Sequence, residues 1–196
     1  MGKRKGLIIV AIAVLLLAVA CKVADAYLSY PIQPDMANLT EHISKFYNRG
    51  RKTEVSPYIA LYDSVNIGDR TYCLMEIGED LDFGSVALEK SVFGRYRIAR
   101  MSYGGGHFRD GIIESGGKKY FLFAGRDITA RICKATALIG GERYELYTPE
   151  QKDHFLLCTE ISDQAQEKHV DRSEITFYDK NNRDITDQYN LSGGGI

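Results

Sequence analysis

The sequence contains no tryptophan and only four prolines among its 196 residues, and its formal net charge is only −1. Because basic residues are not in excess, the overall charge is unsuited to general nucleic-acid binding, which must neutralise phosphates, and no nucleic-acid partner is expected. Its four cysteines, Cys21, Cys73, Cys133 and Cys158, include no C-x-x-C pair, which excludes the common zinc and redox motifs. Buried, unpaired thiols are expected instead, because free cysteine behaves as a small hydrophobe.

The usual catalytic and cofactor motifs are missing too. There is no G-x-S-x-G, no H-E-x-x-H and no phosphate loop, and the four histidines lie far apart. The acidic stretches 76–82 and 179–184 lack the D-x-D-x-D-G spacing of a calcium loop. We therefore expect no cofactor and no metal.

One long apolar run is present, at the N-terminus. Lys3, Arg4 and Lys5 precede residues 7–20, none of which is polar. As a helix this run would rise about 21 Å, short of the roughly 30 Å core of a bilayer, and its length fits the apolar region of a signal peptide. The basic cluster predicts that the N-terminus stays inside while the rest crosses the membrane.

The end of this run resembles a bacterial lipobox. Residues 17–21 read Leu-Ala-Val-Ala-Cys, and in that family the cysteine becomes the acylated N-terminus, so the resemblance implies lipid attachment at Cys21. The Ala-Val-Ala sequence also fits ordinary signal peptidase, which would release a secreted protein. A third outcome is an uncleaved helix that anchors the chain. All three place the remainder outside the cytoplasm, and both anchored forms hold it at the extracytoplasmic face of the cell membrane.

The rest of the chain has the pattern of a mainly β protein. Apolar residues at Met36, Leu39, Ile43 and Phe46 predict one amphipathic helix, of roughly 13 residues, after an N-cap at Asp35. From residue 58 short apolar segments alternate with turns, and glycines at 68, 116–117 and 140–141 favour tight hairpins. Strands are expected near 58–65, 70–77, 85–92, 95–102, 109–115, 118–124, 129–138, 142–147, 154–161 and 174–179.

These elements predict an antiparallel sandwich or barrel-like meander of about ten strands with one N-terminal amphipathic helix. The segment YFLFAG, 120–125, is apolar on both faces and is expected to be a central strand. Residues 1–20 form the signal peptide or anchor, 21–33 a tether, 34–191 the β-rich domain and 192–196 a flexible tail. A division near 125–128 would separate six strands from four, but one continuous architecture is favoured because the later block alone has little core.

The stretch SYGGGHFRDG, 102–111, is the strongest candidate for a binding loop. His107, Arg109 and Asp110 follow three glycines, but no Lys-Ser or Lys-Thr follows, and no helix is expected whose N-terminus would bind an anion. A glycine-rich hairpin is the simpler interpretation, with these three side chains at a candidate binding tip.

Basic residues cluster around this loop. On adjacent strands they would form a positive face for an anionic partner; they are Arg95, Arg97, Arg100, Lys118 and Lys119. The competing interpretation is a solvated face whose charges protect strand edges from aggregation.

Together these features predict a membrane-tethered, extracytoplasmic, non-enzymatic protein of the cell envelope with a binding or structural role. Its expected partners are the membrane, through the N-terminus, and an envelope protein or an anionic envelope component. One alternative is a small envelope hydrolase that uses His107 and separated carboxylates. Another is a small-ligand-binding protein, which would need a closed barrel around an apolar cavity.

Overall fold

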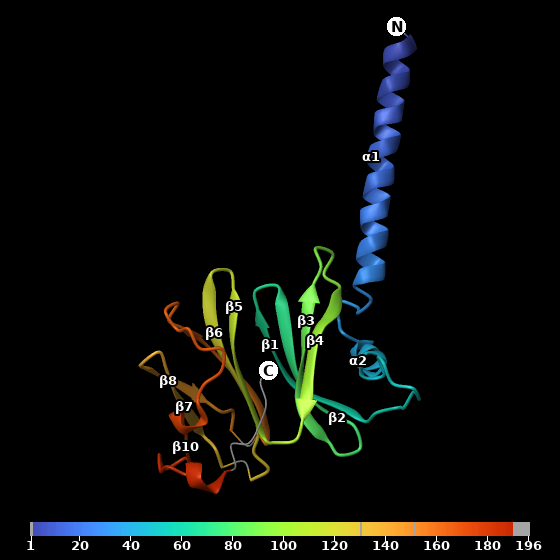
Figure 1. The fold of residues 1–196 in the computed structure, drawn as a ribbon. Helices are drawn as coiled ribbons and strands as arrows, with labels where there is room; N and C mark the ends of the chain where they lie inside the picture. Colours follow the sequence, from blue (N-terminus) through green and yellow to red (C-terminus); the bar gives the residue numbers. More distant parts are fainter. Residues whose placement is uncertain (1, 130, 151, 190–196) are drawn as a thin grey trace.

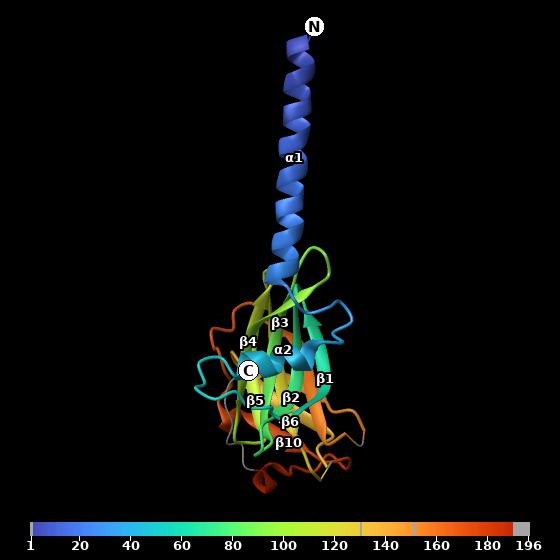
Figure 2. The ribbon, with the colours of Figure 1, turned by 90° about the vertical axis from the view of Figure 1, so that its right-hand side faces the viewer.

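The computed structural model describes residues 2–129, 131–150 and 152–189, and it contains a long N-terminal helix and a β domain (Figures 1 and 2). Helix α1, Gly2–Ser29, is rich in alanine and leucine and stands away from the domain in both views. The segment expected to be a tether is helical as far as Ser29. The predicted tail at 192–196 lies outside the described residues.

The second helix is shorter than its apolar pattern predicts. Helix α2 spans Leu39–Tyr47, because Met36 has a φ of 58°, which a right-handed helix does not allow. Asp35 closes a local turn, in which its Oδ1 accepts a hydrogen bond from the Ala37 amide at 3.0 Å. The predicted N-cap at Asp35 is therefore wrong, whereas the predicted apolar stripe is confirmed by the burial of Leu39 and Ile43.

All ten predicted strands are present, and they form three antiparallel sheets. The first has the order β1-β2-β3-β4, the second β5-β6-β9 and the third β10-β7-β8. The predicted turn glycines adopt φ values between 58° and 83°. The strands are β1 Ile59–Ile67, β2 Arg70–Ile77, β3 Asp82–Lys90, β4 Tyr96–Gly104, β5 Phe108–Ser115, β6 Lys118–Arg126, β7 Lys134–Ile139, β8 Glu142–Tyr147, β9 His154–Ile161 and β10 Ile175–Tyr178, and the 3₁₀ helices η1 Arg172–Glu174 and η2 Thr186–Gln188 flank β10.

The second sheet is the middle layer of the domain, and β6 is its central strand. Leu122 and Ala124 point into the core shared with the first sheet. Phe121 and Phe123 point the opposite way, into the core shared with the third sheet. Both faces of β6 are buried, which confirms the prediction from the apolar run at 120–125.

Helix α2 covers the outer face of the first sheet. Leu39 and Ile43 pack there with Met75, Val86 and Leu88. The layers therefore run from α2 through the first and second sheets to the third, as in a sandwich with an added layer. In the described part of the chain the sheets do not close into a barrel, so the arrangement that the small-ligand alternative requires is not formed there.

The four cysteines are free. Cys73 is buried on β2, and burial raises the pKa of its thiol to about 11. The thiol is therefore protonated at neutral pH and packs as a core residue.

Candidate functional site

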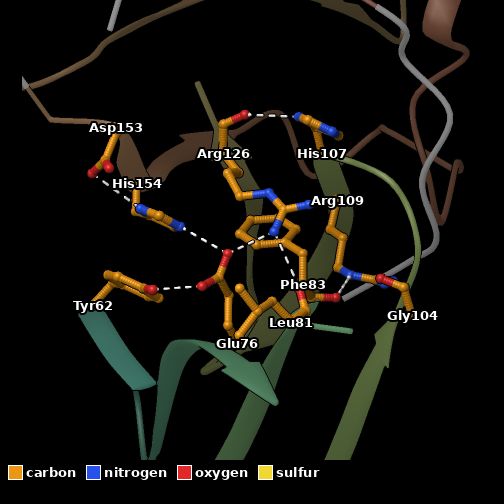
Figure 3. A network of polar contacts seen from close by, with 10 residues as sticks. All are labelled: Tyr62, Glu76, Leu81, Phe83, Gly104, His107, Arg109, Arg126, Asp153 and His154. Carbon is orange, nitrogen blue, oxygen red and sulfur yellow. Dashed lines mark hydrogen bonds and ion pairs between the residues drawn. The ribbon is translucent and has the colours of Figure 1, made fainter. Parts of the chain in front are cut away.

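A network of polar side chains lies where the first sheet meets the second (Figure 3). Its centre is Glu76 on β2, which is only 5% exposed. Around it lie Tyr62 from β1, Arg126 from the end of β6 and His154 from the start of β9. The network thus joins strands of two different sheets.

Both oxygens of the Glu76 carboxylate accept hydrogen bonds. The Tyr62 hydroxyl donates to Oε2 at 2.6 Å. Nη1 of Arg126 donates to Oε1 at 2.7 Å, and Nε2 of His154 lies 3.2 Å from the same oxygen. Burial alone would raise the pKa of Glu76, but these three hydrogen bonds outweigh it, so the net pKa shift is downward and the carboxylate is the stable form.

Each partner of Glu76 also contacts a group other than the Glu76 carboxylate. The rings of Tyr62 and His154 stack with centroids 3.7 Å apart and planes 1° from parallel. Nδ1 of His154 lies 3.0 Å from Oδ1 of Asp153, an ion-pair distance without hydrogen-bond geometry. Arg126 also donates to the Leu81 carbonyl at 3.1 Å. Each side chain is fixed by at least one contact outside Glu76.

This set of residue types is also the set used in general acid–base catalysis. Here, however, Glu76 is 5% and His154 is 9% exposed, and the Glu76 oxygens already accept bonds from groups of the fold. A substrate would have to displace buried, charge-assisted hydrogen bonds to reach them. We interpret the network as a structural link between the two sheets, and we call its four residues, Tyr62, Glu76, Arg126 and His154, the latch.

The latch predicts a specific dependence of stability on pH. The folded pKa of Glu76 lies below its ordinary value of 4.5, so the unfolded chain binds more protons as acid is added. The stabilisation by Glu76 is complete above the unfolded pKa and is lost as the pH falls through the folded pKa. We expect urea unfolding to show stability falling from pH 6 towards pH 3. The free energy of unfolding of Glu76→Gln should fall less over the same pH range. An equal fall in both proteins would contradict the lowered pKa of Glu76 in the folded state.

The three residues of the candidate binding tip do not converge. His107 is half-buried, and its Nδ1 lies 3.3 Å from the Arg126 carbonyl. Arg109 is 4% exposed and donates to the carbonyls of Phe83 at 2.8 Å and Gly104 at 3.1 Å (Figure 3). Burial lowers the pKa of this guanidinium. Asp110 lies one residue along β5 and accepts a hydrogen bond from the Val170 amide at 2.8 Å.

A pocket of about 230 Å³ lies beside His107 and is also lined by Asp127. Oδ1 of Asp127 accepts from the Thr129 hydroxyl at 2.7 Å and the Tyr189 hydroxyl at 3.0 Å. Its Oδ2 accepts from the amides of Arg131 at 2.6 Å and Ile132 at 2.8 Å. This carboxylate holds the β6–β7 connection, so it is not a free base for a hydrolase built on His107.

Most residues of the predicted basic face have partners within the domain. Arg95 donates to the carbonyls of Tyr30 and Pro31, and Arg97 makes a 2.8 Å ion pair with Glu89. Lys118 pairs with Glu160 at 2.9 Å, and Lys119 donates to the Ala165 carbonyl. Arg100 is exposed and shares a pocket of about 380 Å³ with Lys119, Glu114 and Glu167. The charges there are mixed, which is the arrangement of a solvated face.

Cys21 lies on an exposed part of α1. Comparisons of the chain with protein-family models, curated proteins and solved structures find no match.

Proposed function

We propose that the chain is a membrane-tethered protein whose β domain lies outside the cytoplasm and serves a binding or structural role in the cell envelope. The observation that carries the proposal is the exposed apolar surface of α1. Residues 12–29 of this helix have a mean hydropathy of 1.9, and none of that segment is buried against the domain. Leu15, Leu16 and Leu17 are each at least 64% exposed. Such a surface is unfavourable in water and favourable in lipid.

The apolar run 7–20 alone is shorter than the hydrocarbon core of a bilayer, but α1 continues to Ser29, so a span can include helical residues on either side of that run. About 20 helical residues cross the hydrocarbon core of a bilayer, and a span that starts at Gly6, directly after Lys3, Arg4 and Lys5, would reach Asp25. Lys22 would lie near the end of such a span, where its side chain extends towards the interface. The length of the helix is thus compatible with an uncleaved anchor, and acylation of Cys21 is the other anchored form.

The binding or structural role is supported by how the titratable side chains are used. Glu76, Asp127 and Arg109 are buried and bonded within the domain. They stabilise contacts between strands and connecting segments, so their role is structural. The surface remains the region for recognition.

Membrane fractionation with intact mass spectrometry tests the proposal. The full chain, with a tag at its C-terminus, should remain with the membranes after alkaline carbonate washing. A mass equal to the 22.0 kDa chain plus its tag would identify the uncleaved anchor, and an acylated chain beginning at Cys21 would identify the lipoprotein. Cys21→Ala is the matched control, because it removes the acylation site and leaves the helix apolar. A soluble chain in both proteins would overturn the proposal.

A further inference from the structure

The turn between β3 and β4 exposes two apolar side chains. Val92 is 95% exposed and Phe93 is 50% exposed. The turn itself is well ordered by hydrogen bonds: the Gly94 amide donates to the Ser91 carbonyl at 3.0 Å, and the Ser91 amide donates to the Arg95 carbonyl at 2.7 Å. Gly94 supplies the positive φ of 78° that the turn requires. A fixed turn therefore presents these side chains outward.

This turn is attached to the end of α1. The Arg95 guanidinium donates to the carbonyls of Tyr30 and Pro31, each at 2.8 Å, and lies 4.6 Å from the centre of the Tyr27 ring. The Tyr30 hydroxyl donates to Glu89 on β3 at 2.9 Å. In both ribbon views the β3–β4 turn reaches up beside the base of α1 (Figures 1 and 2). Its position relative to the helix is thus set by direct contacts.

The same geometry places the turn at the bilayer surface. If α1 spans from Gly6 to about Asp25, Tyr27 and Leu28 lie in the interface, where tyrosine is favoured. Arg95 contacts Tyr27, and the β3–β4 turn, which contains Val92 and Phe93, reaches up beside the base of α1 (Figure 1). The apolar tip is therefore at the depth of the lipid headgroups.

Charge and composition distinguish this turn from its neighbours. Lys90 and Arg95 flank the tip; Arg95 is bonded to the end of α1, whereas Lys90 is exposed and, in the described part of the chain, has no carboxylate within ion-pair distance. The β1–β2 and β5–β6 turns lie at the same end of the domain but consist of Gly68-Asp69 and Gly116-Gly117. Of these three turns, the β3–β4 turn is the one that exposes large apolar side chains beside a lysine, the combination that binds an anionic membrane surface.

We propose that the β3–β4 turn is a second membrane contact, in which Val92 and Phe93 insert at the headgroup level of the bilayer that holds α1 and the exposed Lys90 faces anionic lipids, while Arg95 holds the turn against the end of α1. This inference rests on the proposed membrane anchoring and adds a fixed orientation of the domain. A helix alone would let the domain tilt, whereas two contacts hold one end of the sheets against the membrane.

The absence of tryptophan makes a direct test available. The full-length Val92→Trp variant, reconstituted in phosphatidylcholine vesicles containing phosphatidylglycerol, carries a single fluorophore at the tip. Ile128→Trp is the matched control, because Ile128 is 72% exposed in the β6–β7 connection at the opposite end of the domain. With brominated acyl chains in the vesicles, the Val92→Trp emission should be quenched about twofold or more, and that of Ile128→Trp should be unchanged.

The outcomes separate the two proposals. If both variants float with the vesicles and neither is quenched, the anchor stands and the membrane contact of the turn is wrong. If the chain does not float, the anchoring itself fails and the contact fails with it. Adding Lys90→Gln to Val92→Trp should weaken the quenching, with the larger effect in vesicles that contain phosphatidylglycerol. If Val92→Trp is quenched equally with and without Lys90→Gln in those vesicles, Lys90 does not contribute to binding anionic lipids.

Discussion

Glu76→Ala should lower the free energy of unfolding by about 3–5 kcal/mol, the usual cost of removing one partner from a buried ion pair. The substitution leaves the Arg126 guanidinium, whose side chain is 19% exposed, without its carboxylate. It also removes the acceptor of the Tyr62 hydroxyl and the partner of His154 Nε2. Tyr62, Arg126 and His154 would thus all lose the carboxylate that accepts their hydrogen bonds at the junction of the two sheets.

Urea unfolding at pH 7, followed by circular dichroism, measures this loss. Glu79→Ala is the matched control, because Glu79 lies three residues further along the chain and is exposed; its effect should stay within about 0.5 kcal/mol. A loss below about 1 kcal/mol for Glu76→Ala would contradict the latch, since it would mean that water solvates the freed donors at little cost.

A double-mutant cycle separates the ion pair from its surroundings. Arg126→Met on the Glu76→Leu background should cost clearly less than Arg126→Met in the native protein, because the guanidinium no longer has a carboxylate to neutralise. The coupling energy should lie in the range of about 0.5–3 kcal/mol that is typical of contacting residues.

The strands of this fold can be predicted from sequence because their signals are local. Apolar alternation and turn glycines fix the ten strands, and the two-sided apolar run at 120–125 identifies β6 as central. The start of α2 could not be predicted in this way. Asp35 and Met36 fit a helix by residue type, but a positive φ at Met36 depends on how the chain enters the first sheet.

No local sequence pattern predicts the latch. Arg126 and His154 lie 50 and 78 residues from Glu76 in the chain, and only the packing of the sheets brings them together. Glu76 also belongs to an acidic stretch, 76–82, and a run of acidic residues is typical of exposed chain, whereas the Glu76 side chain lies in the interior. Single sequences carry no information on such pairings.

Strand geometry separates the side chains of the candidate tip at 107–110. Arg109 and Asp110 are adjacent on β5, and adjacent residues of a strand point to opposite faces. In the structure Arg109 bonds to the main chain of Phe83, while Asp110 bonds to that of Val170. Alternation alone therefore argues against a shared site for these two side chains.

Phe123→Ala should be about as damaging as the loss of Glu76, with a cost of about 3–5 kcal/mol. The Phe123 ring is 1% exposed and lies within 6.0 Å, between centroids, of Phe108, Phe121, Phe155 and Phe177. These rings come from the second and third sheets, so the residual cavity would lie between those layers. Ile128→Ala, an exposed control, should change the stability by no more than about 0.5 kcal/mol.

The location of the cavity gives this prediction a second readout. Hydrogen exchange should show the main-chain amides of β7, β8 and β10 losing protection in Phe123→Ala more than those of β2 and β3, because the first sheet packs on the opposite face of β6 through Leu122. Leu122→Ala should produce the reverse pattern. If both variants expose all three sheets equally, the layers unfold as one unit; if Phe123→Ala weakens the first sheet most, the layer order described for this fold is wrong.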